Sequence, residues 1–282
     1  MQVRIAGCAL AAAVLVLSAC GGTSKSDTKA SAPQRLDVTA RDYVLDVSGS
    51  TALRPGPVHI TAHNAGKQAH GFVLAKIKDG LSAAQVITTF QKDPRTGGTM
   101  LLYAGGTTTL PSGSTWKGTT SFDPGTYLML DVGFGGGRLN FTRQGEIRSF
   151  TVSGKAAVAG AAKPLTTVSL WDYTVEMPDR IAGKGPMLIR NTGNDTHELS
   201  FIRVKGPAAG KHLIHQLHSG KATRLKGVSY DVLAPSAPDT ATTVDVSLPK
   251  GTYVAYCRYY TPMSRGIPHV QLGMAKTVEV VR

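Results

Sequence analysis

The sequence predicts an all-β protein that folds as two tandem Greek-key β-sandwiches, each with a short helical insertion. The chain has 282 residues, which suggests two domains rather than one. Thr and Val dominate many segments, 32 glycines and 15 prolines separate them, and long amphipathic helical patterns are scarce. Short alternating segments divided by turn residues are typical of β-sandwiches. An internal repeat then locates the boundary between the two domains.

Three sequence landmarks occur twice, in the same order along the chain. They are Asp-Tyr at 42–43 and 172–173, Asn-x-Gly-x-x-x-His at 64–70 and 191–197, and Gly-Thr-Tyr at 125–127 and 251–253. Three landmarks at nearly constant offsets predict two homologous domains. Their expected bounds are 36–153 and 165–282, and the small residues of 154–164 form a linker between them.

Alternating apolar and polar residues predict the strands of the second domain. We expect these strands at residues 168–175, 186–190, 197–204, 243–248, 252–257 and 276–281. The most helix-like segments, 82–91 and 211–220, occupy equivalent places in the two domains. Each domain is therefore expected to carry one helical insertion between strands.

The first 19 residues are interpreted as a signal peptide rather than as structure. Arg4 supplies a positive start, the apolar stretch 9–17 is too short to span a bilayer, and Leu-Ser-Ala-Cys at 17–20 resembles a bacterial lipobox. This pattern predicts lipid attachment to Cys20 and a flexible tether over 20–35, which would hold the protein on the outer face of a cell membrane. The alternative is an ordinary secretory signal with an incidental cysteine.

The mature chain carries a strong positive charge. Removing Arg4 with the signal lowers the formal net charge from +13, which leaves 30 basic and 18 acidic residues and a charge of +12. The basic residues are scattered singly, without a run and without interleaved aromatic residues. This pattern predicts attraction to anionic lipids or cell-wall polymers and no nucleic-acid binding.

One cysteine remains for chemistry in the mature chain. Cys8 leaves with the signal, Cys20 is the predicted lipidation site, and Cys257 stays unpaired. His269 and Met274 follow Cys257 closely. Together with an upstream histidine, a thiolate, an imidazole and a thioether are the ligand types of a blue-copper site.

The second domain resembles the cupredoxin family, and it is most similar to the cupredoxin-like lipoproteins of actinobacteria. The resemblance rests on Asn191-Thr-Gly-Asn-Asp-Thr-His197, Gly251-Thr-Tyr-Val-Ala-Tyr-Cys257, Pro268-His269 and Gly273-Met274. It covers most of residues 165–282 and, more weakly, the first domain. It implies that His197, Cys257, His269 and Met274 are copper ligands. Met263 lies on the same loop, so the axial thioether stays open between Met263 and Met274.

Two observations favour the opposite interpretation, a cupredoxin fold without metal. Eleven residues, 258–268, separate Cys257 from His269, whereas ordinary electron-transfer cupredoxins have only a few there. The first domain keeps His70 but has Asp131 in place of the cysteine, and no His, Cys or Met in 132–140. We therefore predict that the first domain is a degenerate, metal-free domain that lacks metal ligands, and that such a histidine can persist for structural reasons.

A second group of histidines, His212, His215 and His218, lies at helical spacing and is interpreted as a solvated helix face. The motifs of serine hydrolases, phosphate loops and zinc proteases are missing, and so are the His-x-His pairs of a multicopper oxidase, so we expect the protein not to be an enzyme. The expected function is copper binding for electron transfer or copper handling, with a redox or envelope protein as partner. The alternative is a metal-free binding module at the cell envelope.

Overall fold

The structure is a computed structural model, and it describes residues 33–49, 52–132, 146–157, 162–221 and 227–281. These residues belong to one compact unit, Ser31–Arg282. The predicted signal peptide (1–19), the predicted lipidation site Cys20 and most of the predicted tether lie outside the described residues.

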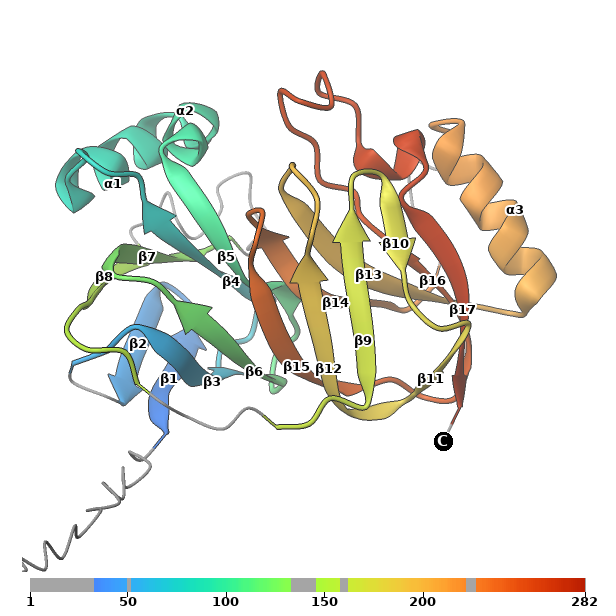
Figure 1. Ribbon diagram of the computed structural model, residues 1–282, viewed down its shortest axis with the longest axis horizontal. Coiled ribbons are helices and arrows are strands. Elements are labelled where there is room, and N and C mark those ends of the chain that lie inside the picture. Colours follow the sequence, from blue (N-terminus) through green and yellow to red (C-terminus); the bar gives the residue numbers. More distant parts are fainter. Residues whose placement is uncertain (1–32, 50–51, 133–145, 158–161, 222–226, 282) are drawn as a thin grey trace, which may run out of the picture. The chain divides into compact units, whose positions relative to one another are not determined.

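Strands and helices follow one another in two similar series (Figure 1). The first series is β1 (Gln34–Arg41), β2 (Val44–Gly49), β3 (Gly56–Asn64), β4 (His70–Ile77), α1 (Ala83–Lys92), α2 (Pro94–Thr99), β5 (Leu101–Leu110), β6 (Thr115–Phe122), β7 (Gly125–Asp131) and β8 (Ile147–Val152). The second is β9 (Thr166–Trp171), β10 (Thr174–Glu176), β11 (Arg180–Ala182), β12 (Lys184–Asn191), β13 (His197–Val204), α3 (Pro207–His218), β14 (Ser229–Ser236), β15 (Ala241–Ser247), β16 (Gly251–Tyr256), the 3-10 turn η2 (His269–Leu272) and β17 (Ala275–Val281). The predicted all-β class, with two tandem sandwiches and helical insertions, is confirmed.

Two sheets contain the described strands, and each sheet takes strands from both series. Their orders are β10-β9-β12-β15-β6-β3-β1-β2 and β11-β17-β16-β13-β14-β5-β4-β7-β8. The series meet where β6 pairs with β15 and where β5 pairs with β14. Trp116 of β6 adds a link by donating a hydrogen bond of 3.0 Å from Nε1 to the carbonyl of Val232 in β14.

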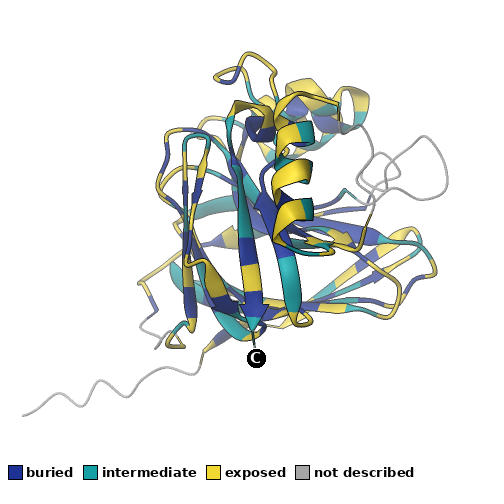
Figure 2. Ribbon diagram, turned by 90° about the vertical axis from the view of Figure 1, so that its right-hand side faces the viewer, coloured by how far each residue is buried: buried dark blue, intermediate teal, exposed yellow. Residues whose placement is uncertain are grey.

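The hydrophobic core lies between the two sheets. Strand β1 alternates buried and exposed residues along most of its length, as expected for a strand with one face on a core. Strands β4 and β7 are buried almost throughout. Figure 2 shows the same division, with buried ribbon in the strands and an exposed outer face on α3.

The same strand pairings occur in both series, which explains the sequence repeat. The first strand of each series pairs in parallel with a later one, β1 with β3 and β9 with β12. The Gly-Thr-Tyr triplets also have the same role. Tyr127 donates its hydroxyl to the carbonyl of Asp123 at 3.1 Å, and Tyr253 donates to that of Pro249 at 2.7 Å. Such a tyrosine corner fixes the loop that precedes each strand.

The predicted strand at 168–175 is wrong in one respect, because it is two strands. β9 ends at Trp171 and β10 begins at Thr174, and Tyr173 between them has a φ of 64°. The alternation of residue types continues through the turn, so the sequence pattern conceals it. Asp172 is released from the strand and accepts hydrogen bonds from the amides of Asn194 and Asp195, at 2.9 and 3.1 Å.

Both predicted helical insertions are present. Ser82 caps α1 by accepting a hydrogen bond from the amide of Gln85 at 3.2 Å. The histidines of α3 are exposed, as expected for a solvated helix face. The short helix α2 was not predicted, and it is capped by the Asp93 side chain, which accepts from the amide of Arg95.

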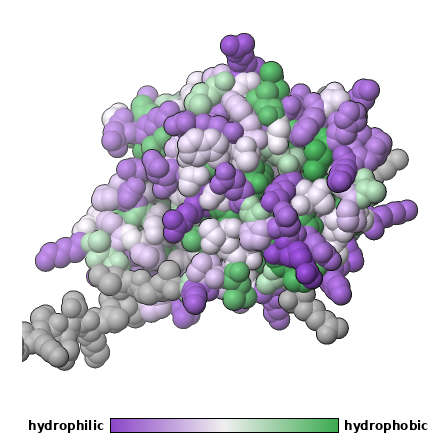
Figure 3. Space-filling view, turned by 45° about the vertical axis from the view of Figure 1, so that its right-hand side comes forward, coloured by the Kyte–Doolittle hydropathy of each residue, from purple (hydrophilic) through white to green (hydrophobic). Residues whose placement is uncertain are grey.

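The surface agrees with the polar composition of the chain. Figure 3 shows a face that is mostly hydrophilic, with small apolar areas between charged side chains. Among the described residues, no helix has the length and apolar character that a membrane span requires.

Candidate metal centre

The Asn-x-Gly loop sets the position of His197 at the start of β13. Asn191 donates from its amide nitrogen to the carbonyls of Asp195 and Ser236, at 2.7 and 2.8 Å. Its amide oxygen accepts from the backbone of Gly193 at 3.1 Å. A Cβ on Gly193 would lie 2.5 Å from Oδ1 of Asp172, so only glycine lets the loop approach this closely.

His197 is oriented by a carboxylate behind it. Its Nε2 lies 3.2 Å from Oδ1 of Asp172, and the ring is fully buried. This contact turns Nδ1 toward the interior, where it lies 3.0 Å from Nδ1 of His269. A carboxylate on the outer nitrogen is the usual way in which proteins fix the tautomer of a metal-binding histidine.

Cys257 follows β16 and is also fully buried. Its amide donates to the carbonyl of Met274 at 3.1 Å, which ties the two ends of the long loop together. Its Sγ accepts a hydrogen bond from the amide of Glu198 at 3.4 Å. One hydrogen bond therefore fixes the backbone of Cys257 and another fixes its sulfur before any ion is considered.

His269 lies on η2, at the far end of the loop of residues 258–268. Its amide donates to the carbonyl of Tyr259 at 2.9 Å, so the loop closes on itself and its length does not loosen the site. Its Nε2 lies 3.2 Å from Oδ2 of Asp195, although the direction is too bent for a full hydrogen bond. The ring also packs edge-on against Tyr173, with 5.4 Å between the ring centroids.

The three side chains converge on one point. Sγ of Cys257 lies 3.6 Å from Nδ1 of His269, and the ligand atoms of His197, Cys257 and His269 all lie within 4.8 Å of one another. Ligand atoms bound to one ion at about 2.0 Å for nitrogen and 2.3 Å for sulfur are roughly 3 to 4 Å apart. The spacing of 3.0 Å between the two Nδ1 atoms and that of 3.6 Å between Sγ and Nδ1 of His269 fit this requirement. The donor set of two imidazoles and a thiolate fits copper.

The structure separates the two methionines of the loop. Met274 is fully buried in the same hydrophobic cluster as Cys257, whereas Met263 is 56% exposed. The amide of Met274 donates to the carbonyl of His269 at 3.0 Å, so it is joined to two of the three converging residues. Met274 is therefore the better placed of the two for an axial ligand.

Burial determines the protonation states of the candidate ligands. It lowers the pKa of His197 and of His269, which keeps both imidazoles neutral and able to bind a metal ion. Burial, with a smaller effect from the Glu198 charge, raises the pKa of Cys257 well above its usual value. A thiolate is therefore unstable at this position unless a cation compensates its charge.

Sequence reasoning missed the residues behind the ligands. Asp195 lies inside the repeated Asn-x-Gly-x-x-x-His segment, and Glu198 directly follows it. At the equivalent positions of the first half of the chain, the residues are of other types. Asp172 did carry a signal, because Asp-Tyr is one of the three repeated landmarks. Cys20, the predicted lipidation site, lies outside the described residues.

No protein-family model and no curated protein matches the chain. Among solved structures, auracyanin from Roseiflexus castenholzii is 14% identical, with a TM-score of 0.27, over 44% of this chain and 100% of auracyanin. A multicopper oxidase is 12% identical, with a TM-score of 0.26, over 88% of each chain. The copper-containing nitrite reductase of Thermus scotoductus is 14% identical, with a TM-score of 0.24, over 88% of this chain and 61% of the reductase. The assignment of ligands rests on this chain's own residues.

One expectation is corrected by these neighbours. The chain was expected not to be an enzyme, but the multicopper oxidase and the nitrite reductase are enzymes. That expectation rested on missing motifs of hydrolases, zinc proteases and phosphate-binding proteins, and on the lack of the His-x-His pairs that a multicopper oxidase needs for its additional metal sites. These absences carry no information about redox chemistry at a single copper ion, so the exclusion of enzymes is withdrawn.

Proposed function

We propose that the second sandwich binds one copper ion through His197, Cys257 and His269, with Met274 as a weak axial ligand. The observation that carries this proposal is the convergence of one ligand atom each from His197, Cys257 and His269 within 4.8 Å of one another, in a fully buried position. Soft sulfur donors combined with imidazole favour copper over magnesium or calcium. A bound copper ion would supply one-electron redox chemistry between Cu(I) and Cu(II).

The surrounding residues support electron transfer as the use of this site. Asp172 makes a hydrogen bond of 3.2 Å with the outer nitrogen of His197, and Asp195 lies 3.2 Å from the outer nitrogen of His269. The amide of Glu198 holds the sulfur of Cys257. Ligands fixed in this way move little when the charge of the ion changes, so the energy of reorganisation stays small. The four side chains are fully buried, which favours a resident ion over one that is exchanged.

The location of the protein is part of the proposal. The Leu-Ser-Ala-Cys segment at 17–20 supports a lipid on Cys20 that holds the protein at the outer face of the cell membrane. Its redox partner would then be another protein of the envelope. Replacing Cys20 with Ser should release the protein from the membrane fraction into the soluble fraction, and retention in the membrane would contradict a lipid anchor.

A redox titration tests the proposed use of the site. The purified full chain is loaded with one equivalent of Cu(II), then reduced with dithionite and reoxidised while the visible spectrum is recorded. A thiolate-to-copper band that disappears on reduction by one electron and returns on oxidation, over repeated cycles, supports electron transfer. Loss of copper on reduction would instead indicate copper handling, and absence of copper binding would leave a metal-free binding module.

A further inference from the structure

The first sandwich contains a second group of buried side chains with metal-binding atoms. They are His70, Asp131 and Glu146, each at most 1% exposed, and their ligand atoms all lie within 4.8 Å of one another. Nδ1 of His70 makes a hydrogen bond of 2.6 Å with Oδ2 of Asp131 and lies 3.9 Å from Oε2 of Glu146. The three residues come from the start of β4, the end of β7 and the position before β8.

Strand register places Asp131 where the second sandwich has Cys257. Lys76 pairs with Tyr127 across β4 and β7, and Arg203 pairs with Tyr253 across β13 and β16. Each tyrosine belongs to the repeated Gly-Thr-Tyr triplet. Asp131 and Cys257 both come four residues after it. The carboxylate therefore stands at the position of the thiolate.

A comparison of backbone hydrogen bonds shows that Glu146 occupies the position in the first sandwich that Met274 occupies in the second. The amide of Asp131 donates to the carbonyl of Glu146 at 3.1 Å, and the amide of Cys257 donates to the carbonyl of Met274 at 3.1 Å. Each carbonyl belongs to the residue just before the last strand of its series, β8 or β17. Both sulfur ligands of the second sandwich are thus matched by carboxylates in the first.

The histidine is presented in the same way in both sandwiches. Nε2 of His70 lies 3.2 Å from Oδ1 of Asp42, as Nε2 of His197 lies 3.2 Å from Oδ1 of Asp172. Asp42 also accepts a hydrogen bond from the amide of Gln68. In each case the outer nitrogen faces a carboxylate on the loop, and Nδ1 faces the position that corresponds to the copper site.

Glu146 shows that this group needs a cation. Neither oxygen of its carboxylate has a hydrogen-bond partner in the described part of the chain, and the side chain is 1% exposed. Two carboxylates buried side by side are costly unless a positive charge lies between them.

We propose that His70, Asp131 and Glu146 bind a divalent first-row transition-metal ion that prefers nitrogen and oxygen donors, such as Zn²⁺. One imidazole and two carboxylates suit such an ion, and the two negative charges balance its charge. Asp42 is the positioning residue for His70. The duplicated fold would then hold two metal sites with different donor atoms. The second sandwich supplies soft sulfur donors, and the first supplies hard carboxylate oxygens.

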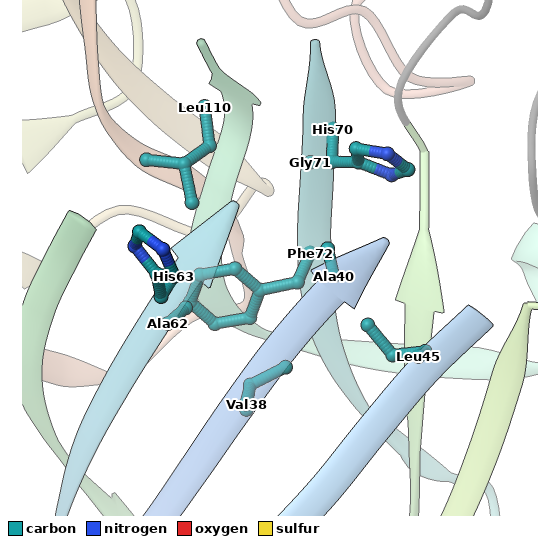
Figure 4. A pocket seen from close by; sticks show the side chains of 9 residues that line it. All are labelled: Val38, Ala40, Leu45, Ala62, His63, His70, Gly71, Phe72 and Leu110. Carbon is teal, nitrogen blue, oxygen red and sulfur yellow. The ribbon is translucent and has the colours of Figure 1, made fainter. Parts of the chain in front are cut away.

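The small pocket beside His70 is a separate feature. It is lined mainly by apolar residues, among them Val38, Phe72 and Leu110, and in Figure 4 the His70 ring projects away from the ring of Phe72. Its lining includes neither Asp131 nor Glu146. The proposed ion therefore belongs to the carboxylate side of His70 and not to this pocket.

Metal titration of the full chain tests the proposal. The Cys257→Ser variant removes the thiolate of the second sandwich and leaves the first sandwich untouched. Titration calorimetry with Zn²⁺ should show one equivalent bound to this variant. Co²⁺ in its place should give weak visible bands without a thiolate charge-transfer band. Absence of Zn²⁺ binding would overturn the proposal.

A second variant locates the ion. Adding Glu146→Gln to Cys257→Ser keeps the volume of the side chain and should weaken Zn²⁺ binding by about 100-fold or more. Asp37→Asn, a change at an exposed carboxylate of β1, is the matched control and should leave the affinity unchanged. Unchanged binding after Glu146→Gln would overturn the proposal, since the histidine pair of the second sandwich would then hold the ion. Glu146→Gln alone leaves Cys257 intact, so the visible copper band reports separately on the proposed function.

Discussion

Nδ1 of His197 lies 3.0 Å from Nδ1 of His269, although 72 residues separate them in the chain. Both rings are fully buried, and each has its outer nitrogen 3.2 Å from a carboxylate, Asp172 or Asp195. Two histidines held in this way leave their inner nitrogens aimed at the same point, next to Sγ of Cys257. This arrangement supports the proposed metal site.

Removing the carboxylate behind His197 should weaken copper binding. Asp172→Asn takes away the charge that orients Nε2 at 3.2 Å, and loss of such a contact typically reduces metal affinity by about 10- to 100-fold. A competition titration with a copper chelator measures the change. Asp42→Asn makes the same change in the first sandwich, and it should leave copper affinity as it is. Equal effects of the two variants would show that the loss is one of general stability.

Met274 and Met263 should differ in their effect on the copper spectrum. Met274→Leu nearly preserves volume but removes the axial donor, which stabilises Cu(II) more than Cu(I), so the reduction potential should rise. Met263 is 56% exposed, and Met263→Leu should leave both the potential and the visible spectrum unchanged. A redox titration of each copper-loaded variant makes the comparison. A shift for Met263→Leu alone would reverse the assignment.

Acid should destabilise the metal-free protein through the two buried histidines. Their pKa values are lowered from 6.5 by burial, so between the folded pKa and 6.5 the unfolded chain binds more protons than the folded one. The two histidines should therefore lower the free energy of unfolding as the pH drops below about 6.5, and this effect should level off below their folded pKa. Glu146 and Glu198, whose pKa values burial raises to about 7, contribute in the opposite direction. Urea unfolding between pH 5 and about 7.5 measures this slope. His269→Gln should have a smaller slope than wild type, and an unchanged slope would contradict the assignment.

The tyrosine corner should contribute measurably to the stability of the second sandwich. Tyr253→Phe leaves the carbonyl of Pro249 without the hydroxyl that lies 2.7 Å away, and a lost buried hydrogen bond of this kind costs about 1–2 kcal/mol. Urea unfolding provides the measurement. Tyr260→Phe, at a tyrosine that is 55% exposed, is the control and should change stability by less than about 0.5 kcal/mol. Equal effects at the two tyrosines would contradict a special role for the corner.

The repeated residues were predictable because each one performs a local task. Asn191 satisfies the carbonyls of its own loop, Gly193 lets that loop approach Asp172, and Tyr253 closes the turn before β16. Since the same tasks arise in the first sandwich, the same residue types recur at the same spacing. The fold class and the residues that converge around Cys257 could therefore be anticipated.

Contacts between segments that are distant in the chain could not be predicted from local sequence patterns. The pairing of β5 with β14 and of β6 with β15 joins strands from different halves of the chain. Glu146 lies next to Asp131 because of the strand register. Neither residue is of the same type as its counterpart in the second sandwich, Met274 or Cys257. The loop of residues 258–268 seemed too long for a tight site, but the bond from the amide of His269 to the carbonyl of Tyr259 closes it at 2.9 Å.

Titration of the metal-free full chain with Cu(II), followed by visible absorption, tests the central claim most directly. The wild-type protein should develop an intense thiolate-to-copper charge-transfer band that saturates at one equivalent. In Cys257→Ser, which keeps both histidines, that band should be missing. A wild-type protein that binds no copper, or a band of equal intensity in Cys257→Ser, would contradict a copper site built on Cys257.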